Sequence, residues 1–374
     1  MFVPVSKPFL NEDEHRLVLE AVRGGMISGS GGNFIDTFEK KFADFCGVKY
    51  AVTTTSGTTA LHLAMAILGV GPGDEVLIST FTNMATFFAV LYQGAKPIPI
   101  DCESKTLNLN PQLLEEKITS KTKGIIVVHI YGHPVDMDPV LEVAKKYNLF
   151  VVEDAAEAHG ARYKGKMVGS LGDIGCFSFY ANKIITTGEG GMITTNNPDF
   201  EKRAKILKSL AFGDNDKFMH QYIGYNYRMT NVQAAIGCAQ MDKINDIINR
   251  KRNIAKFYLE NLKDIKCIQM PVEESYAFNV YWMFNIILKD KLSGKRSLFM
   301  KELKRRGVET REDFVPFNQQ EIFIRQGLTK PEDCPVVNSF FKDGLYIPSG
   351  TDITEEELRY AVEQIKEVVN SLCI

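Results

Sequence analysis

Three short segments of the chain carry residue types that could bind a ligand and act on it chemically. The first is Ser56-Gly57-Thr58, which lies between a β-rich run and a helical stretch rich in Ala and Leu. Glycine lets the backbone approach a ligand closely, and the free N–H groups at the start of a helix favour an anion such as a phosphate. A Ser or Thr side chain that only caps the helix beside a tight turn is the alternative interpretation.

The second segment is an apolar run that ends in carboxylates, at Glu153, Asp154 and Glu157. A buried carboxylate at the end of a strand needs a cationic partner, and a protonated pyridine nitrogen would serve. Ala155 and Ala156 are small and leave room for a flat group beside the carboxylate. A carboxylate that caps the next helix, or one that binds a magnesium ion, is the alternative.

The third segment surrounds Lys183, in a loop with aromatic residues before it and glycines after it. Most lysines are solvated surface charges, but a lysine in a partly dry cleft has a lowered pKa and can form a Schiff base. A phosphate-binding turn, a carboxylate that faces a pyridine nitrogen and a Schiff-base lysine describe one cofactor site. We therefore expect the three segments to meet in the fold.

An alternating pattern between about Lys49 and Asn196 supplies the elements that would position these residues. The expected strands cover residues 50–53, 75–79, 97–100, 124–129, 149–153, 175–179 and 191–195, and the expected helices cover 58–68, 111–118 and 137–147. Such alternation predicts an α/β fold, with a mostly parallel sheet between two layers of helices. Open α/β sheets bind ligands at the carboxyl ends of their strands, where the three segments lie.

The pattern changes after about Arg250 and predicts a smaller α+β domain. The expected elements are a long charged helix over 231–262, a strand over 280–288, a helix over 296–306, extended segments around 309–315 and 345–347, and a final helix over 354–372. We therefore divide the chain into a large domain of residues 1–245, which includes an N-terminal arm, and a small domain of residues 246–374.

The composition is that of an ordinary globular protein, with 45% hydrophobic and 24% charged residues. The net charge of -2 gives no reason to expect nucleic acid as a partner. The 7 cysteines include no CxxC pair, and the spacing of Cys and His predicts no metal site. We also find no apolar run long enough to cross a membrane and no signal peptide, so we expect a cytoplasmic protein without membrane contact.

Longer motifs around the same segments resemble the DegT/DnrJ/EryC1/StrS family of sugar aminotransferases. The motifs lie at residues 153–160, 186–192 and 224–231, and the resemblance runs from Ser28-Gly29 to the C-terminal helix. Among the branches of the family the chain looks most like the GDP-perosamine synthases, on residues 131–134 and 182–191. The resemblance implies the fold-type I architecture of aspartate aminotransferase, with pyridoxal 5′-phosphate (PLP) as cofactor and pyridoxamine 5′-phosphate (PMP) as its intermediate form.

The resemblance also implies roles for individual residues. Lys183 would hold the cofactor covalently and move protons, Asp154 would keep the pyridine nitrogen protonated, and Glu157 would lie near the 3′-hydroxyl. The expected phosphate-binding residues are Ser56, Gly57, Thr58 and Ser178. Asn226 and Arg228 would reach in from a second subunit, so that the active sites would be shared within a homodimer. Residues 224–231 can equally form the start of a helix that Thr230 or Asn231 caps.

Two departures from the family pattern fall near the expected ligands. Asn83 stands where the family usually has an aromatic residue that stacks on the cofactor ring, so that Phe87 or an amide face would have to cover the ring. In the stretch that lines the substrate pocket, Glu312 replaces a proline and Asn318 replaces a histidine. The expected substrate-binding residues are His129, Arg311 and Asn318.

The family resemblance predicts transfer of an amino group from L-glutamate to the keto carbon of a nucleotide-linked 4-keto-6-deoxy sugar, for a surface polysaccharide. A smaller phosphorylated ketone, such as a ketose phosphate, is the alternative that the altered 311–318 stretch favours. A PLP-dependent sugar dehydratase is a third possibility, although such relatives carry histidine in place of the Schiff-base lysine. The chain has no GxGxxG after a strand, which argues against a nicotinamide dehydrogenase.

Overall fold

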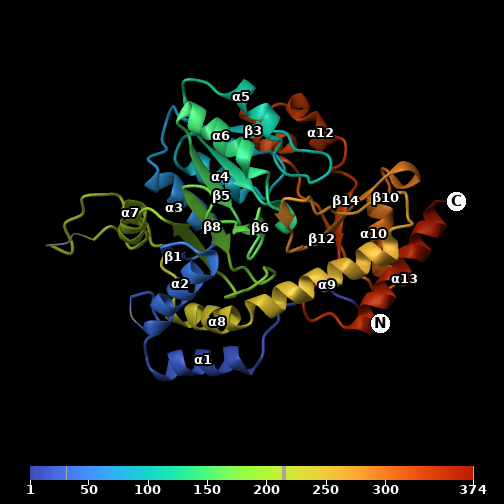
Figure 1. The fold of residues 1–374 in the computed structure, drawn as a ribbon, viewed down its shortest axis with the longest axis horizontal. Helices are drawn as coiled ribbons and strands as arrows, with labels where there is room; N and C mark the ends of the chain where they lie inside the picture. The colour runs from blue at the N-terminus through green and yellow to red at the C-terminus, as the bar shows by residue number, and fades with distance from the viewer. Residues whose placement is uncertain (31, 213–215, 374) are drawn as a thin grey trace.

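The computed structural model describes residues 1–30, 32–212 and 216–373. Its centre is a seven-stranded sheet in the order β1-β9-β8-β5-β4-β2-β3 (Figure 1). The strands are β1 (Tyr50–Thr54), β2 (Glu75–Ser79), β3 (Lys96–Ile100), β4 (Thr122–Val128), β5 (Phe150–Asp154), β8 (Ile174–Ser178) and β9 (Gly191–Thr195). Only β9 pairs antiparallel with its neighbours in this sheet, within the described residues. The predicted α/β fold with a mostly parallel sheet is confirmed.

Helices cover both faces of this sheet because the side chains of its central strands alternate between two apolar layers. In β4, Ile126 packs in one layer, whereas Ile125 and Val127 pack in the other. The helices of the first layer are α3 (Gly57–Ile67), α4 (Ala85–Tyr92) and α7 (Pro198–Lys208). The helices of the opposite face are α2 (Asn33–Cys46), α6 (Met137–Tyr147) and α8 (Asn231–Asp242), with α1 (Glu12–Arg23) packed outside α8 (Figure 1).

A second, four-stranded antiparallel sheet lies in the C-terminal part of the chain, in the order β10-β12-β14-β13. Its strands are β10 (Ile268–Gln269), β12 (Phe284–Leu288), β13 (Arg311–Glu312) and β14 (Gly344–Ile347). The helices α9 (Ile244–Leu262), α10 (Arg296–Arg305) and α13 (Glu355–Leu372) pack against it in one apolar cluster (Figure 1). The division of the chain at residues 245 and 246 stays a prediction.

The remaining elements are short. A three-stranded sheet joins β6 (Arg162–Tyr163), β7 (Lys166–Met167) and β11 (Ala277–Phe278). The short helices are α5 (Leu114–Lys117), α11 (Glu321–Arg325) and α12 (Pro335–Asn338), and the 3-10 turns are η1 (Pro111–Leu113), η2 (Ile130–Gly132), η3 (Asp290–Leu292), η4 (Phe317–Gln319) and η5 (Pro331–Asp333).

The C-terminal elements differ in places from the sequence prediction. The expected helix over 231–262 is two helices, because the backbone of Lys243 leaves the helical conformation between α8 and α9. The expected strand over 280–288 begins only at Phe284, because the preceding backbone bonds to the η2 turn instead of to a strand. The extended segment around 309–315 pairs with β14 over two residues only.

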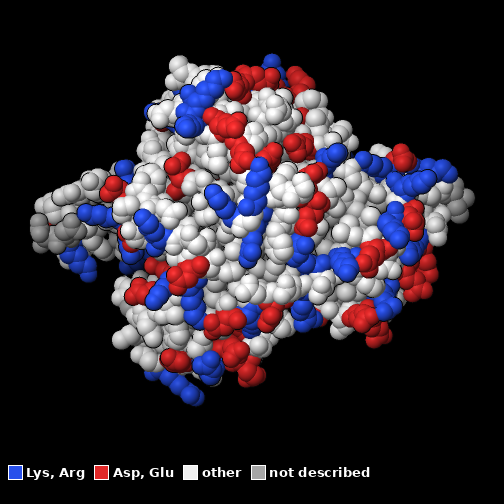
Figure 2. Space-filling model, in the orientation of Figure 1, with Lys and Arg blue, Asp and Glu red and all other residues white. Residues whose placement is uncertain are grey.

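The surface carries charges of both signs. On the face drawn in Figure 2, Lys and Arg side chains are interspersed with Asp and Glu side chains. Among the described helices, none combines the length and the apolar character that crossing a bilayer requires.

Candidate active site

The three segments singled out in the sequence meet at one pocket of about 330 Å³, beside the carboxyl ends of β5 and β8. The predicted cofactor residues that line it are Ser56, Gly57, Thr58, Asn83, Asp154, Glu157, Ser178 and Lys183. Helix α3 begins at the pocket and β5 ends there, whereas the Lys183 loop connects β8 to β9. The fold therefore brings together residues that are far apart in the chain.

The turn before α3 forms a cradle at one end of the pocket. Ser56 is the N-cap, and its hydroxyl accepts a hydrogen bond from the N–H of Thr59 at 3.1 Å. The N–H groups of Gly57 and Thr58, in the first turn, have no partner within the helix and are suited to bind a phosphate. A Cβ at Gly57 would lie 2.7 Å from Cβ of Ser178, so any larger residue would close the cradle. The cap at Ser56 therefore leaves the N–H groups of Gly57 and Thr58 available for an anion in the same turn.

Asp154 lies at the end of β5 and is almost fully buried. Its carboxylate accepts hydrogen bonds from the Thr86 hydroxyl at 2.8 Å and from the N–H of Ala156 at 3.2 Å. Burial raises the pKa of Asp154, and these two neutral donors only partly offset that effect. A cationic ring nitrogen beside the carboxylate would stabilise its charged form, which fits the pyridine nitrogen of PLP.

Lys183 is largely buried beside Glu157, with 3.9 Å between its Nζ and Oε1 of the carboxylate. Burial lowers the pKa of Lys183 and raises the pKa of Glu157 to about 7. The other carboxylate oxygen of Glu157 accepts the backbone N–H of Tyr131 at 2.8 Å. A lysine with a lowered pKa supplies more of the neutral amine, which is the form that attacks a carbonyl carbon.

The opposite wall of the pocket comes from the C-terminal part of the chain and was missed by the sequence analysis. It consists of three aromatic side chains, Trp282, Phe314 and Tyr346. Trp282 is the single tryptophan of the chain, which was the one available signal. Phe314 lies inside the 311–318 stretch that was expected to line the substrate pocket, but the expectation fell on other residues.

The three expected substrate residues do not line this pocket. His129 is fully buried, with Nε2 at 3.0 Å from Glu153 and Nδ1 accepting the N–H of Val135 at 3.0 Å. Asn318 is also fully buried and donates to the carbonyl of Pro331 at 2.8 Å, so it fastens a loop. Arg311 lies at the surface and pairs with Glu309 at 2.7 Å. In all three cases the side chain points away from the pocket, and the sequence motif does not specify that direction.

Asn83 lines the pocket, as expected, but Phe87 does not. The Phe87 ring is buried and stacks on Phe317, with 4.0 Å between ring centroids and 7° between planes. Phe87 therefore belongs to the apolar layer under the sheet and cannot cover a cofactor ring in this conformation.

Asn226 and Arg228 lie outside the pocket of their own chain. Nε and Nη2 of Arg228 each donate to the Asn226 side chain at 3.0 Å. The alternate residues Tyr225 and Tyr227 stack on each other and turn inward, where the Tyr227 hydroxyl lies 2.9 Å from Nδ1 of His62. Helix α8 follows with Thr230 as its cap. This alternation leaves Asn226 exposed and Arg228 half-buried beside it.

The sequence profile of the DegT/DnrJ/EryC1/StrS aminotransferase family matches residues 8–366. The chain belongs to this family. GDP-perosamine synthases from Caulobacter vibrioides and Escherichia coli O157:H7 are 40% and 41% identical to it, over 98% of this chain and 98% of each relative. The solved structure of Spr1654 from Streptococcus pneumoniae, in a PLP form and a PMP form, has a TM-score of 0.93 and 27% identity over 100% of this chain and at least 98% of the other.

The protein is therefore a PLP-dependent aminotransferase, and the predicted family, fold type and cofactor are confirmed. The pocket fits the cofactor on its own terms as well. Its cradle can hold a phosphate, the buried Asp154 can face a cationic ring nitrogen, and Lys183 can reach a carbonyl carbon between them.

Proposed function

We propose that this aminotransferase moves an amino group from L-glutamate to the keto carbon of a nucleotide-linked 4-keto-6-deoxy hexose, for a surface polysaccharide. The observation that carries the proposal is that Lys183, Asp154 and the Gly57 turn line one pocket. The nearly full-length similarity to two GDP-perosamine synthases supports a nucleotide sugar as acceptor.

In this proposal Lys183 is the group that moves protons. When bound, PLP supplies an electrophilic carbon that carries the amino group and a ring that takes up electron density. Because burial lowers the pKa of Lys183, its amine is neutral more often than that of an exposed lysine, and the neutral Nζ can accept a proton from the carbon that bears the amino group. The same Nζ returns a proton when the amino group is delivered to the ketone.

The two carboxylates divide the remaining work. Asp154 orients the ring and holds a proton on its nitrogen, because the charged carboxylate gains a cationic partner inside a dry site. Glu157 faces the amine of Lys183 and favours its protonated form, which opposes the effect of burial. The opposing effects of burial and of Glu157 keep Nζ able both to accept and to release a proton.

The aromatic wall suits a sugar ring more than a small ketone. Trp282, Phe314 and Tyr346 give the side of the pocket opposite the cradle an apolar surface, and ligand pockets commonly combine such surfaces with a few polar groups. The Asn318 substitution favoured a smaller acceptor only if its side chain reached the ligand. Because Asn318 is buried away from the pocket, it gives that alternative no support.

We also propose that the working enzyme is a homodimer with shared active sites. Asn226 and Arg228 lie at the surface and outside their own pocket, where a second copy can meet them. Arginine is well suited to bind a phosphate or carboxylate group there, because its planar guanidinium donates two parallel hydrogen bonds.

The visible absorbance of the PLP-loaded protein tests the reaction directly. Addition of L-glutamate should bleach the band of the lysine-bound cofactor, and D-glutamate serves as the control donor. A GDP- or UDP-linked 4-keto-6-deoxy hexose should then restore the band. Recovery with a ketose phosphate but not with either nucleotide sugar would replace the proposed acceptor by the smaller ketone. A band that L-glutamate leaves unchanged would overturn the proposed donor.

A further inference from the structure

The indole of Trp282 lies against the amine that the reaction uses. Nζ of Lys183 is 3.7 Å from the centroid of the Trp282 ring, and both residues line the same pocket. At this distance a lysine ammonium is attracted by the negative face of the ring, and the attraction is stronger in a site from which water is excluded. The amine therefore has two partners, the Trp282 ring and the carboxylate of Glu157.

Trp282 is held in place at three points. Its indole N–H donates to the carbonyl of Asn182 at 2.7 Å, so the ring is fastened to the residue that precedes Lys183. Its backbone N–H donates to the carbonyl of Tyr131 at 2.9 Å. Its own carbonyl accepts the ammonium of the buried Lys251 at 2.8 Å. The first contact fixes the indole ring itself, and the other two fix the backbone that carries it.

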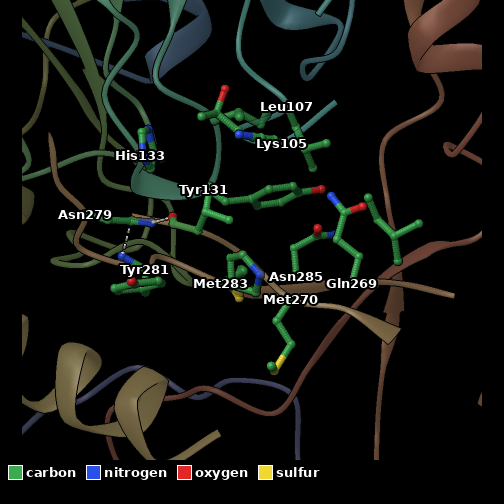
Figure 3. A pocket seen from close by; sticks show the side chains of 15 residues that line it. Lys105, Leu107, Tyr131, His133, Gln269, Met270, Asn279, Tyr281, Met283 and Asn285 are labelled. Carbon is green, nitrogen blue, oxygen red and sulfur yellow. Dashed lines mark hydrogen bonds between the residues drawn. The ribbon is translucent and has the colours of Figure 1, made fainter. Parts of the chain in front are cut away.

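The backbone of Tyr131 connects both partners of the amine. Its N–H donates to Glu157, and its carbonyl accepts from Trp282. Tyr131 has φ of 53°, a left-handed conformation that is uncommon for a tyrosine and that is found more often at functional sites than elsewhere. Its phenol lies towards Asn285 in Figure 3 and donates to Asp313 at 3.0 Å. One strained residue thus fixes the spacing between carboxylate and indole.

We propose that Trp282 is a positioning residue for Lys183, whose amine it holds against the indole face whenever that amine is not attached to the cofactor. This proposal rests on the proposed role of Lys183 in the reaction. A free lysine side chain has many rotamers. An amine that is distributed over many rotamers is seldom in the position from which it can transfer a proton to or from the reacting carbon. The indole and Glu157 together define a resting place within reach of the cofactor.

The charge on Lys183 should therefore change the environment of the indole. The attraction to the ring and to Glu157 favours the ammonium, whereas burial favours the neutral amine. The titratable side chains that surround the pair are Tyr131, which stacks on the indole, Asp154 on β5, Glu157 and His159 after β5, Tyr180 and Glu189 in the Lys183 loop, Lys251 on α9, which donates to the Trp282 carbonyl, and Tyr346 on β14.

The fluorescence of the cofactor-free protein provides the first test, because Trp282 is its single tryptophan. We compare the variant Glu157→Gln, which removes the nearest carboxylate titration, with Glu157→Gln combined with Lys183→Met. The first should show a change in emission with a midpoint below the pKa of an ordinary lysine, and the second, which keeps Asp154 and Lys251, should lack that transition. An emission that is independent of pH in the first variant, or an identical titration in both, would overturn the proposal.

The PLP-loaded enzyme provides the second test. Trp282→Leu removes the ring and should lower the rate of the half-reaction with L-glutamate about tenfold while leaving the KM for glutamate within about twofold. Trp282→Phe keeps an aromatic face and should recover most of the rate. Equal losses in both variants, or a KM that changes together with kcat, would show that Trp282 only supports the fold. The fluorescence test needs no substrate, so its result stands even if L-glutamate proves to be the wrong donor.

Discussion

The two walls of the cofactor pocket differ in where their residues lie in the chain and in what those residues can do. The wall built on the seven-stranded sheet carries the cradle at Gly57, the carboxylate of Asp154 and the amine of Lys183, all next to the ends of strands. The opposite wall carries Trp282, Phe314 and Tyr346, which come from around the four-stranded sheet. The groups that the proposed reaction uses come from the first wall, and the second wall is made of aromatic rings.

This difference separates the groups that react from the surface that positions them. Ionisable groups lie where strand ends and a helix start already provide free N–H groups and a fixed backbone, so little further structure is needed to hold them. The aromatic wall has no such local origin, and its position depends on how the C-terminal part packs against the η2 turn. We expect changes in the first wall to abolish steps of the reaction and changes behind the second wall to affect stability more than turnover.

The largest effect is expected for Lys183→Ala. Turnover should fall by about 10³-fold or more, because Lys183 is the one lysine among the described residues that line the pocket. The cradle and Asp154 should still hold PLP, so the variant should retain bound cofactor but lack the band of its lysine-bound form. Lys145→Ala, at an exposed position on α6, is the matched control. Full turnover in Lys183→Ala would show that the wall built on the seven-stranded sheet does not supply the proton-transfer group.

The same variant also tests the shared active site. Lys183→Ala subunits mixed with Arg228→Ala subunits can form dimers in which one site contains both native residues. Recovery of activity on mixing is the expected result. A mixture that stays as inactive as its components would contradict the proposed contribution of Arg228 across subunits.

A smaller effect is expected for Gly57→Ala, which changes the cradle without removing an ionisable group. The new Cβ would lie 2.7 Å from Cβ of Ser178, so the opening between helix and strand must narrow or shift. The affinity for PLP should fall by roughly 10- to 100-fold, which corresponds to about 1.4–2.7 kcal/mol. Gly71→Ala is the control, because a Cβ there meets no atom within 4 Å. Equal PLP affinities in the two variants, measured by equilibrium titration, would mean that the phosphate binds elsewhere.

The sequence predicted the wall built on the seven-stranded sheet more fully than the aromatic wall, because the signals for its elements are local. The strands β2 and β9 and the helix α6 have the predicted bounds, because their signals lie within the segments themselves. Helices α1, α2, α4 and α7 were not predicted, although α1 and α7 carry local cap signals at Asn11 and Asn197. Those two caps were readable from the sequence and were overlooked.

The aromatic wall depends on contacts between distant segments, which the sequence alone does not reveal. Residues 280–283 look like the start of a strand, but Trp282 bonds to Tyr131 and Asn182 instead. A sequence motif also identifies the residue at a position, but it does not give the direction in which the side chain points. Asn318 occupies a position expected at the substrate, yet its side chain turns into the protein.

Asp313, behind the aromatic wall, offers the finest test of the comparison. Its buried carboxylate accepts the Tyr131 hydroxyl at 3.0 Å and the Asn285 amide at 2.6 Å. Burial raises its pKa to about 7, well above the value in an unfolded chain. The folded protein therefore holds this proton more tightly, and the stability that results is present at low pH and is lost as the pH rises through about 7. The pKa of Glu157 is raised in the same direction, so part of the loss of stability with rising pH will remain in any Asp313 variant.

Asp313→Asn should consequently lose less stability between pH 5 and pH 8 than the unchanged protein does. In the cofactor-free protein we expect the two declines in Tm to differ by roughly 3 °C. Asp264→Asn, in an exposed turn, should show no such difference. Turnover of Asp313→Asn should stay within about threefold of normal, because the carboxylate lies behind the aromatic rings and does not line the pocket. If Asp313→Asn had a normal pH profile of stability but little turnover, the Asp313 carboxylate would take part in the reaction. The aromatic wall would then contribute an ionisable group, and the contrast between the two walls would not hold.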